Sequence, residues 1–153
     1  MALELRIEEQ VYVLSTILDG QPGELARLQE DAQHLLPGNV TPGEARLELA
    51  IETAEDWLMP HVARRNGQVL DVVDVTGRLT SGLLAVLGTS ERTWSLAAIE
   101  QMFVNVVHLT TGPNSNAGLS QHLLFVADLL LIRELAHHGQ VVSVSLRGNR
   151  NSA

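Results

Sequence analysis

The chain has 153 residues, of which 45% are hydrophobic and 18% charged, so it carries enough apolar side chains to form a folded core. This balance excludes a disordered chain, and the length fits a single domain over residues 1–153. The formal net charge is −8, and the absence of cysteine excludes disulfides, a thiolate nucleophile and cysteine-ligated zinc.

The charge is divided unevenly along the chain. Residues 1–60 hold 12 acidic residues and three arginines, whereas residues 61–153 hold six acidic residues and seven arginines. The acidic first half would repel a phosphate backbone, so a basic protein is a better expected partner than nucleic acid. The N-terminus lacks the basic start of a secretory signal, and the apolar run 123–132 is too short to cross a bilayer. We therefore expect a soluble, cytoplasmic protein that makes no membrane contact.

The first elements are predicted to be extended and then helical. Apolar and charged residues alternate over 3–8, which is typical of a half-buried strand, and the β-branched run 11–17 is also predicted to be extended. The segments PGELARL (22–28) and PGEARLEL (42–49) resemble each other, but their flanks differ and we do not infer a duplication. In the second segment Thr41, Pro42 and Glu44 provide a helix start, which predicts a helix over 42–58.

The second half is predicted to contain two long helices between two strands. A short valine-rich run between glycines favours a strand over 68–75. Apolar residues then recur at helical spacing up to Thr111, a second apolar helix follows over 117–138, and VVSVSL predicts a strand over 141–146. The fold class is therefore α+β, mostly helical with a small sheet. If residues 103–109 formed a strand, the second half would instead be a parallel α/β arrangement.

One stretch, within residues 79–103, resembles a DNA-binding helix-turn-helix. The letters LGTS at 87–90 match the turn of such a motif. The packing positions do not match, because Leu84 stands where a small residue is usual, Trp94 is too large for its position and Ala97 is too small for its own. Gly88 is therefore better interpreted as a helix stop, followed by a capped helix start, with Trp94 as a core residue.

The histidines do not predict a metal site. His137 and His138 are adjacent and point about 100° apart on a helix, so they cannot share a metal ion, and the HExxH pattern is absent. We therefore predict neither metal nor cofactor.

Asp128 is the charged residue of greatest interest. It lies on an otherwise apolar helical face, where an unpaired carboxylate would be costly, so we expect it to find an arginine, a helix cap or a subunit interface. A structural ion pair is favoured over a catalytic acid. Its helix is apolar around nearly its whole circumference, which predicts a homo-oligomer formed through residues 117–138.

These patterns favour a non-catalytic, self-associating interaction or regulatory module. One alternative is a DNA-binding regulator that uses residues 79–103 together with Arg92, Arg147 and Arg150. The other alternative is a small-molecule-binding enzyme built around the loop 110–118. Its candidate binding residues are Thr111, Asn114, Ser115, Asn116, His108, His122 and Asp128.

Overall fold

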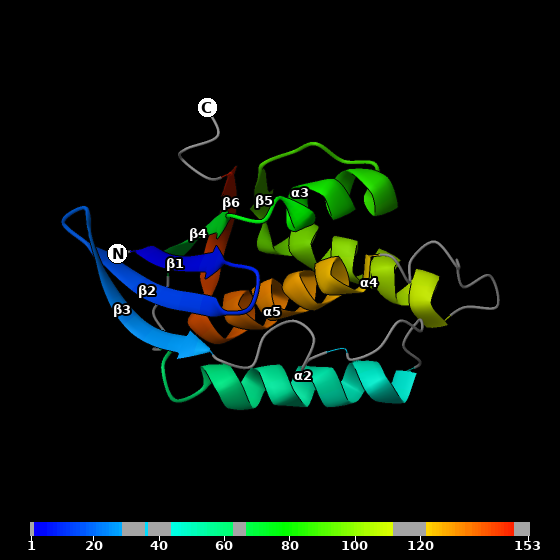
Figure 1. The fold of residues 1–153 in the computed structure, drawn as a ribbon, viewed down its shortest axis with the longest axis horizontal. Coiled ribbons are helices and arrows are strands. Elements are labelled where there is room, and N and C mark those ends of the chain that lie inside the picture. The colour runs from blue at the N-terminus through cyan, green and yellow to red at the C-terminus, as the bar shows by residue number, and fades with distance from the viewer. Residues whose placement is uncertain (1, 29–35, 37–43, 63–66, 112–121, 149–153) are drawn as a thin grey trace.

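The computed structural model describes residues 2–28, 36, 44–62, 67–111 and 122–148 (Figure 1). Its strands form one six-stranded mixed sheet of order β3-β2-β1-β4-β6-β5. The strands are β1 (Ala2–Ile7), β2 (Tyr12–Leu18), β3 (Gln21–Leu28), β4 (Gln68–Asp74), β5 (Thr93–Ser95) and β6 (Val141–Gly148). The helices are α2 (Glu44–Leu58), α3 (Arg78–Gly82), the π-helix η1 (Leu83–Leu87), α4 (Leu96–Thr111) and α5 (Leu123–Gly139).

The sheet combines an antiparallel meander with three parallel strands. β2 pairs antiparallel with both β1 and β3, whereas β1, β4 and β6 run parallel to one another and β5 pairs antiparallel with β6. The three strands predicted near 3–8, 68–75 and 141–146 are confirmed, as is the extended run after residue 11. The α+β class is confirmed, but the expectation of a mostly helical chain with a small sheet is wrong. Residues 22–28, which resemble the later helix start, form a strand instead of a helix.

The two predicted long helices at 42–58 and 117–138 are confirmed where the structure describes them. The helix predicted over 42–58 is confirmed over the described residues Glu44–Leu58, and the apolar helix predicted over 117–138 is confirmed from Leu123 onward. Residues 103–109 lie inside α4, so the proposed parallel α/β arrangement with a strand there is wrong. The apolar residues of this stretch recur at the spacing of a helix, and this spacing decided the conformation although several of them are β-branched, a type that favours strands.

The helix-turn-helix alternative is wrong, and so is the capped helix start expected directly after Gly88. After η1 the backbone turns left-handed at Gly88, with φ of 66°, which confirms a helix stop there. The chain then enters β5 where a recognition helix would have to begin. The next helix starts only at Leu96, and Ser95 Oγ accepts the backbone N–H of Ala98 at 3.1 Å as its cap. Trp94 is 4% exposed and belongs to the core, as predicted.

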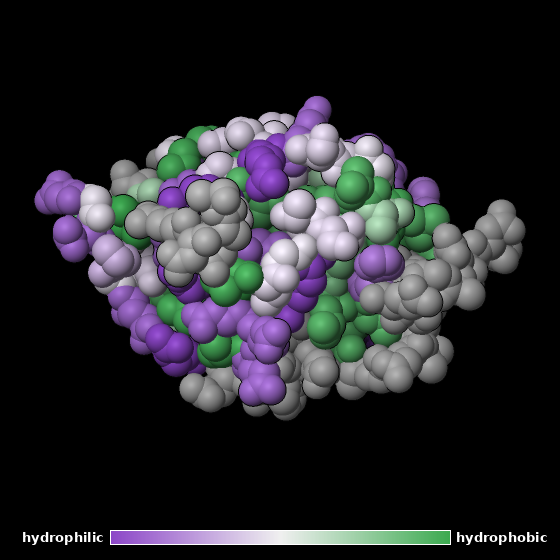
Figure 2. Space-filling model, turned by 45° about the horizontal axis from the view of Figure 1, so that its top comes forward, coloured by the Kyte–Doolittle hydropathy of each residue, from purple (hydrophilic) through white to green (hydrophobic). Residues whose placement is uncertain are grey.

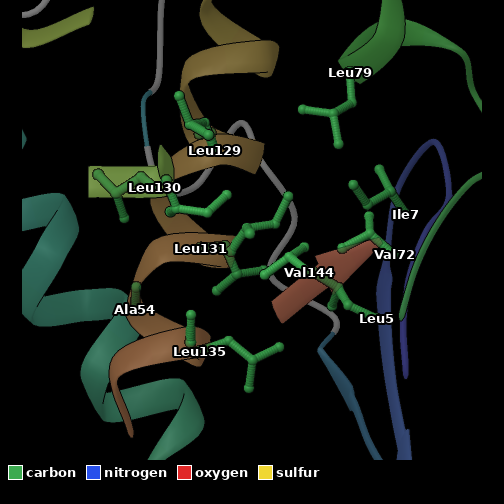
Figure 3. Packing of buried hydrophobic residues seen from close by; sticks show 14 of the residues in the cluster. Leu5, Ile7, Ala54, Val72, Leu79, Leu129, Leu130, Leu131, Leu135 and Val144 are labelled. Carbon is green, nitrogen blue, oxygen red and sulfur yellow. The ribbon is translucent and has the colours of Figure 1, made fainter. Parts of the chain in front are cut away.

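α5 is the centre of the core. It packs on the sheet, and α2, α3 and α4 all contact it (Figure 1). Figure 3 shows leucines of α5 facing Leu5 of β1, Val72 of β4 and Val144 of β6, with Ala54 of α2 on another side. Each fully buried leucine stabilises the fold by roughly 1.5–3 kcal/mol. The apolar sides of α5, which suggested an oligomer, are thus covered by other elements of the same chain. The homo-oligomer formed through residues 117–138 stays a prediction. The single domain over residues 1–153 also stays a prediction.

The opposite face of the sheet is polar. Along β1, the side chains of Leu3, Leu5 and Ile7 are buried toward α5, and those between them are only half-buried on the other face. On the face shown in Figure 2, hydrophobic residues form separate patches between hydrophilic ones. None of the described helices is long and apolar enough to cross a membrane.

Candidate functional site

The carboxyl ends of the three parallel strands meet at one edge of the sheet. Ile7 of β1 is in register with Asp74 of β4, and Asp74 is in register with Gly148 of β6. The turn that follows β1 and the loop that follows β4 lie side by side, because Val75 donates its backbone N–H to the carbonyl of Ile7 at 3.0 Å. In open sheets with parallel strands, ligands bind outside the carboxyl ends of the strands. This edge, formed by residues 8–11 and 74–78, is called the carboxyl edge below.

Asp74 organises the loop after β4. Its carboxylate is buried and accepts the Thr76 hydroxyl at 2.8 Å and the backbone N–H groups of Gly77 (2.9 Å), Leu79 (3.0 Å) and Thr80 (3.2 Å). Four donors therefore hold one carboxylate, and the start of α3 is capped from the preceding strand. Gly77 has a φ of 79°, a left-handed conformation that strains other residues. The result is a rigid loop that presents the next residue, Arg78, at the carboxyl edge.

Arg78, Asp128 and Tyr12 form a buried cluster beside this loop. Arg78 donates from Nε to Asp128 Oδ2 at 2.8 Å and from Nη2 to Oδ1 at 2.9 Å, a bidentate pair. The Tyr12 hydroxyl donates to the same Oδ1 at 2.6 Å. The third nitrogen of Arg78, Nη1, lies 3.4 Å from the backbone carbonyl of Glu9 in the neighbouring turn. The side chain of Asp128 is fully buried, whereas that of Arg78 is 16% exposed, so the guanidinium reaches from the core to the carboxyl edge.

The protonation states of the cluster follow from its burial. Burial raises the pKa of Asp128 to about 6, although hydrogen bonds and charge from Arg78, together with the Tyr12 hydrogen bond, act in the opposite direction. Burial, followed by the charge of Asp128, raises the pKa of Tyr12 well above its usual value, so Tyr12 remains a donor. Burial lowers the pKa of Arg78, but Asp128 outweighs this effect and raises it overall. At neutral pH the cluster therefore holds an ionised Asp128 and a charged Arg78.

The structure confirms the ion pair expected for Asp128 but does not gather the other predicted residues around it. His108 is exposed on α4, and His122 precedes α5 at its N-cap. Thr111 ends α4. Asn114, Ser115 and Asn116 lie outside the described residues, so the loop 110–118 stays a prediction as a binding element.

The arginines of the DNA-binding alternative are dispersed. Arg92 is exposed, and its backbone carbonyl accepts Leu146 N–H at 2.8 Å at the end of β6. Arg147 pairs with Glu4 at 3.4 Å and lines a pocket of about 480 Å³ on the polar face of the sheet, where Asp71 and Arg6 also lie. Arg150 is outside the described residues. This pocket mixes both signs of charge, which does not favour a phosphate backbone.

Sequence reasoning missed Asp74, Thr76, Arg78 and Tyr12. One signal was available, because DVTGR (74–78) directly follows the valine-rich strand and combines an acid, a hydroxyl, a glycine and an arginine. The partnership of Arg78 with Asp128 was not readable, since the two residues are 50 positions apart.

No protein-family model matches the chain, and no curated protein matches it either. Solved structures do match it. The PPX-GPPA enzyme of Aquifex aeolicus has a TM-score of 0.70 at 8% identity, over 96% of this chain and 53% of that one. A second structure of the Aquifex aeolicus Ppx/GppA family member has a TM-score of 0.69 at 10% identity, over 96% and 52% of the two chains. An exopolyphosphatase from Cytophaga hutchinsonii has a TM-score of 0.60 at 10% identity, over 97% and 53%.

The chain thus spans about half the length of these enzymes. They contradict the prediction of a non-catalytic interaction module, and the alternative of a small-molecule-binding enzyme fits them better. At this level of identity the likeness concerns the fold alone. The chain has an α+β fold that matches about half of each Ppx/GppA structure.

Proposed function

We propose that this chain is a phosphatase-type enzyme domain that binds phosphate esters or polyphosphate at the carboxyl edge, through Arg78. The observation that carries the proposal is the fold shared with Ppx/GppA enzymes, one of which is described as an exopolyphosphatase. The carboxyl edge supports it, because this is the side of a sheet with parallel strands where ligands bind.

The chemistry of phosphoryl transfer sets what such a site must supply. Catalysis rests mainly on positioning and on positive charge that stabilises the phosphoryl oxygens. A guanidinium suits this task, because it stays charged and can bind phosphate through two parallel N–H groups. In this chain Nε and Nη2 of Arg78 are held by Asp128, which fixes the plane of the guanidinium and leaves the Nη1 side next to the turn after β1.

Asp128 and Tyr12 are positioning residues in this proposal. Both are buried, and both act on phosphate only by orienting the guanidinium of Arg78. Glu9 has a different role. It is exposed, and its backbone carbonyl lies 3.4 Å from Arg78 Nη1, so its carboxylate is within a side chain's length of a phosphate bound there. We assign to Glu9 the orientation of the attacking water.

The first experiment measures binding of pyrophosphate and of a short polyphosphate by calorimetry. Arg78→Lys keeps the positive charge but loses the Nη1 group beside the turn after β1, and it should weaken binding by about tenfold or more, as expected for a lost charged hydrogen bond. The matched control is Arg46→Lys, at an exposed position on α2, which should bind like the wild type. Equal affinities of all three proteins, or no binding by the wild type, would contradict the proposal.

The second experiment gives a change that loss of folding cannot imitate. Glu9→Gln removes a negative charge beside the phosphate and should tighten binding a few-fold at low salt, in line with about 1 kcal/mol for charges 4 Å apart in water. The same substitution should slow phosphate release from polyphosphate, because water is no longer oriented. Glu91→Gln, at another exposed acid, is the control. Weaker binding by Glu9→Gln would overturn the assignment.

A further inference from the structure

A second cluster of chemically active side chains lies away from the carboxyl edge. Glu55 of α2 and Glu134 and His138 of α5 each place one potential metal ligand atom within 4.8 Å of the other two. Two carboxylates and one imidazole form a donor set suited to Zn²⁺, which commonly takes three protein ligands and a water.

The helices bring these residues together for simple reasons. Glu134 and His138 are four residues apart on α5, so they lie one above the other on the same face. Glu55 follows Ala54, a fully buried residue of α2 in the core that α2 shares with α5. The packing of α2 on α5 therefore fixes the distance between the third ligand and the other two.

Among these three residues, Glu134 gives the clearest sign of an ion-binding site. Its side chain is only 4% exposed, and its Oε1 accepts Arg133 Nη1 at 2.6 Å. Its Oε2 lies 3.9 Å from His138 Nε2, which is beyond hydrogen-bond distance. A buried carboxylate oxygen is thus held toward His138 without closing a bond to it. The same residues line a cavity of about 410 Å³, which offers a cation a path from solvent.

The surrounding side chains orient these ligands. Arg133 bonds both Glu134 and Glu100 and stacks 4.7 Å from the ring centre of Phe103, and His137 contacts Glu100. Metal ligands are usually held in this way by a second set of hydrogen bonds. His137 contacts Glu100, and its neighbour His138 faces Glu134.

We propose that Glu55, Glu134 and His138 bind one Zn²⁺ ion that ties α2 to α5. The site lies toward the end of α5 opposite to Asp128, since Glu134 is six residues further along, about 9 Å at 1.5 Å per residue. α5 leads directly into β6, so its end lies near the amino end of that strand. The ion would therefore link α2 to α5 and lie apart from phosphate bound at the carboxyl edge.

The experiment titrates the chelator-treated chain with Zn²⁺ by calorimetry and measures Tm with and without the ion. The wild type should bind one Zn²⁺ per chain and show a higher Tm when loaded. Glu55→Gln and His138→Gln change half-buried side chains, and each should lower the Zn²⁺ affinity by at least about tenfold, the smallest effect expected even for groups that only support the ligands. X-ray absorption should find one imidazole and oxygen ligands at roughly 2.0–2.2 Å.

The controls are Glu48→Gln on α2 and His108→Gln on α4, both exposed and outside the cluster. They should bind Zn²⁺ like the wild type. The proposal is overturned if the wild type binds no Zn²⁺ at millimolar concentration, or if Glu55→Gln and His138→Gln bind as tightly as the controls. It is also overturned if the absorption spectrum shows no imidazole ligand.

Discussion

Replacing Arg78 by methionine tests the buried cluster most severely. The variant keeps an unbranched side chain but removes two charged hydrogen bonds, of 2.8 and 2.9 Å, from a carboxylate that is fully buried. Asp128 then keeps the Tyr12 hydroxyl at 2.6 Å. Removing one partner of a buried ion pair typically costs about 3–5 kcal/mol of unfolding free energy. We expect a loss in this range at pH 8.

The loss should depend on pH in a defined direction. In the wild type the pKa of Asp128 is about 6 in the folded state, above the roughly 3.9 of an unfolded aspartate. Between these values the folded chain holds a proton that the unfolded chain releases, so the contribution of Asp128 to stability falls as pH rises. Without Arg78 the pKa rises further, and the fall continues above pH 6. The variant should therefore be closest to the wild type at pH 5.

The measurement is urea unfolding of both proteins at pH 5 and pH 8, followed by circular dichroism and by tryptophan fluorescence. A buried, stabilising Arg78–Asp128 pair is refuted if Arg78→Met loses less than about 1 kcal/mol at pH 8, the value typical of an exposed pair. It is equally refuted if the loss at pH 5 matches or exceeds the loss at pH 8, because protonation of Asp128 would then bring no relief.

Three further substitutions test the buried cluster and the packing of α3 on α5. Asp128→Asn should remove the fall in stability between about pH 4 and pH 6, which urea unfolding across this range would detect; an unchanged pH profile would contradict the raised pKa. Tyr12→Phe removes the hydrogen bond to charged Asp128 and should lower the free energy of unfolding by about 1.5–3 kcal/mol. A Tm equal to that of the wild type would show that this hydrogen bond does not stabilise the fold. Gly82→Ala would place a methyl group onto Cβ and Cγ of buried Phe125. The overlap should cost about 1–3 kcal/mol, more than the roughly 1 kcal/mol gained in helix propensity, and a rise in Tm would show that α3 can move away from α5.

The elements that the sequence predicted well are those whose pattern is local. Alternation over residues 3–8 and helical spacing over 42–58 needed no knowledge of neighbouring strands, and both elements formed as expected. The strand Thr93–Ser95 was missed because it is short and continues directly into α4. Its extended conformation comes from pairing with β6, about fifty residues away. Likewise, residues 22–28 form a strand because β2 provides the hydrogen bonds.

The candidate sites show the same limit. The apolar face of the last helix correctly predicted that Asp128 needs a charged partner, but only the fold identifies Arg78 and Tyr12 as that partner and its neighbour. For the proposed Zn²⁺ site, the spacing of Glu134 and His138 was readable in the sequence. Glu55 was not, because its proximity depends on how α2 packs against α5.

The central claim is that phosphate binds at the carboxyl edge, and an NMR titration with pyrophosphate tests it most directly. We expect the shifted backbone amide signals to belong to residues 8–11 and 75–80, and the Nε–H signal of Arg78 to move with them. The Nε–H signal of Arg46 on α2 should stay in place. Shifts confined to other segments, such as the loop 110–118, or no shifts at millimolar pyrophosphate, would contradict it.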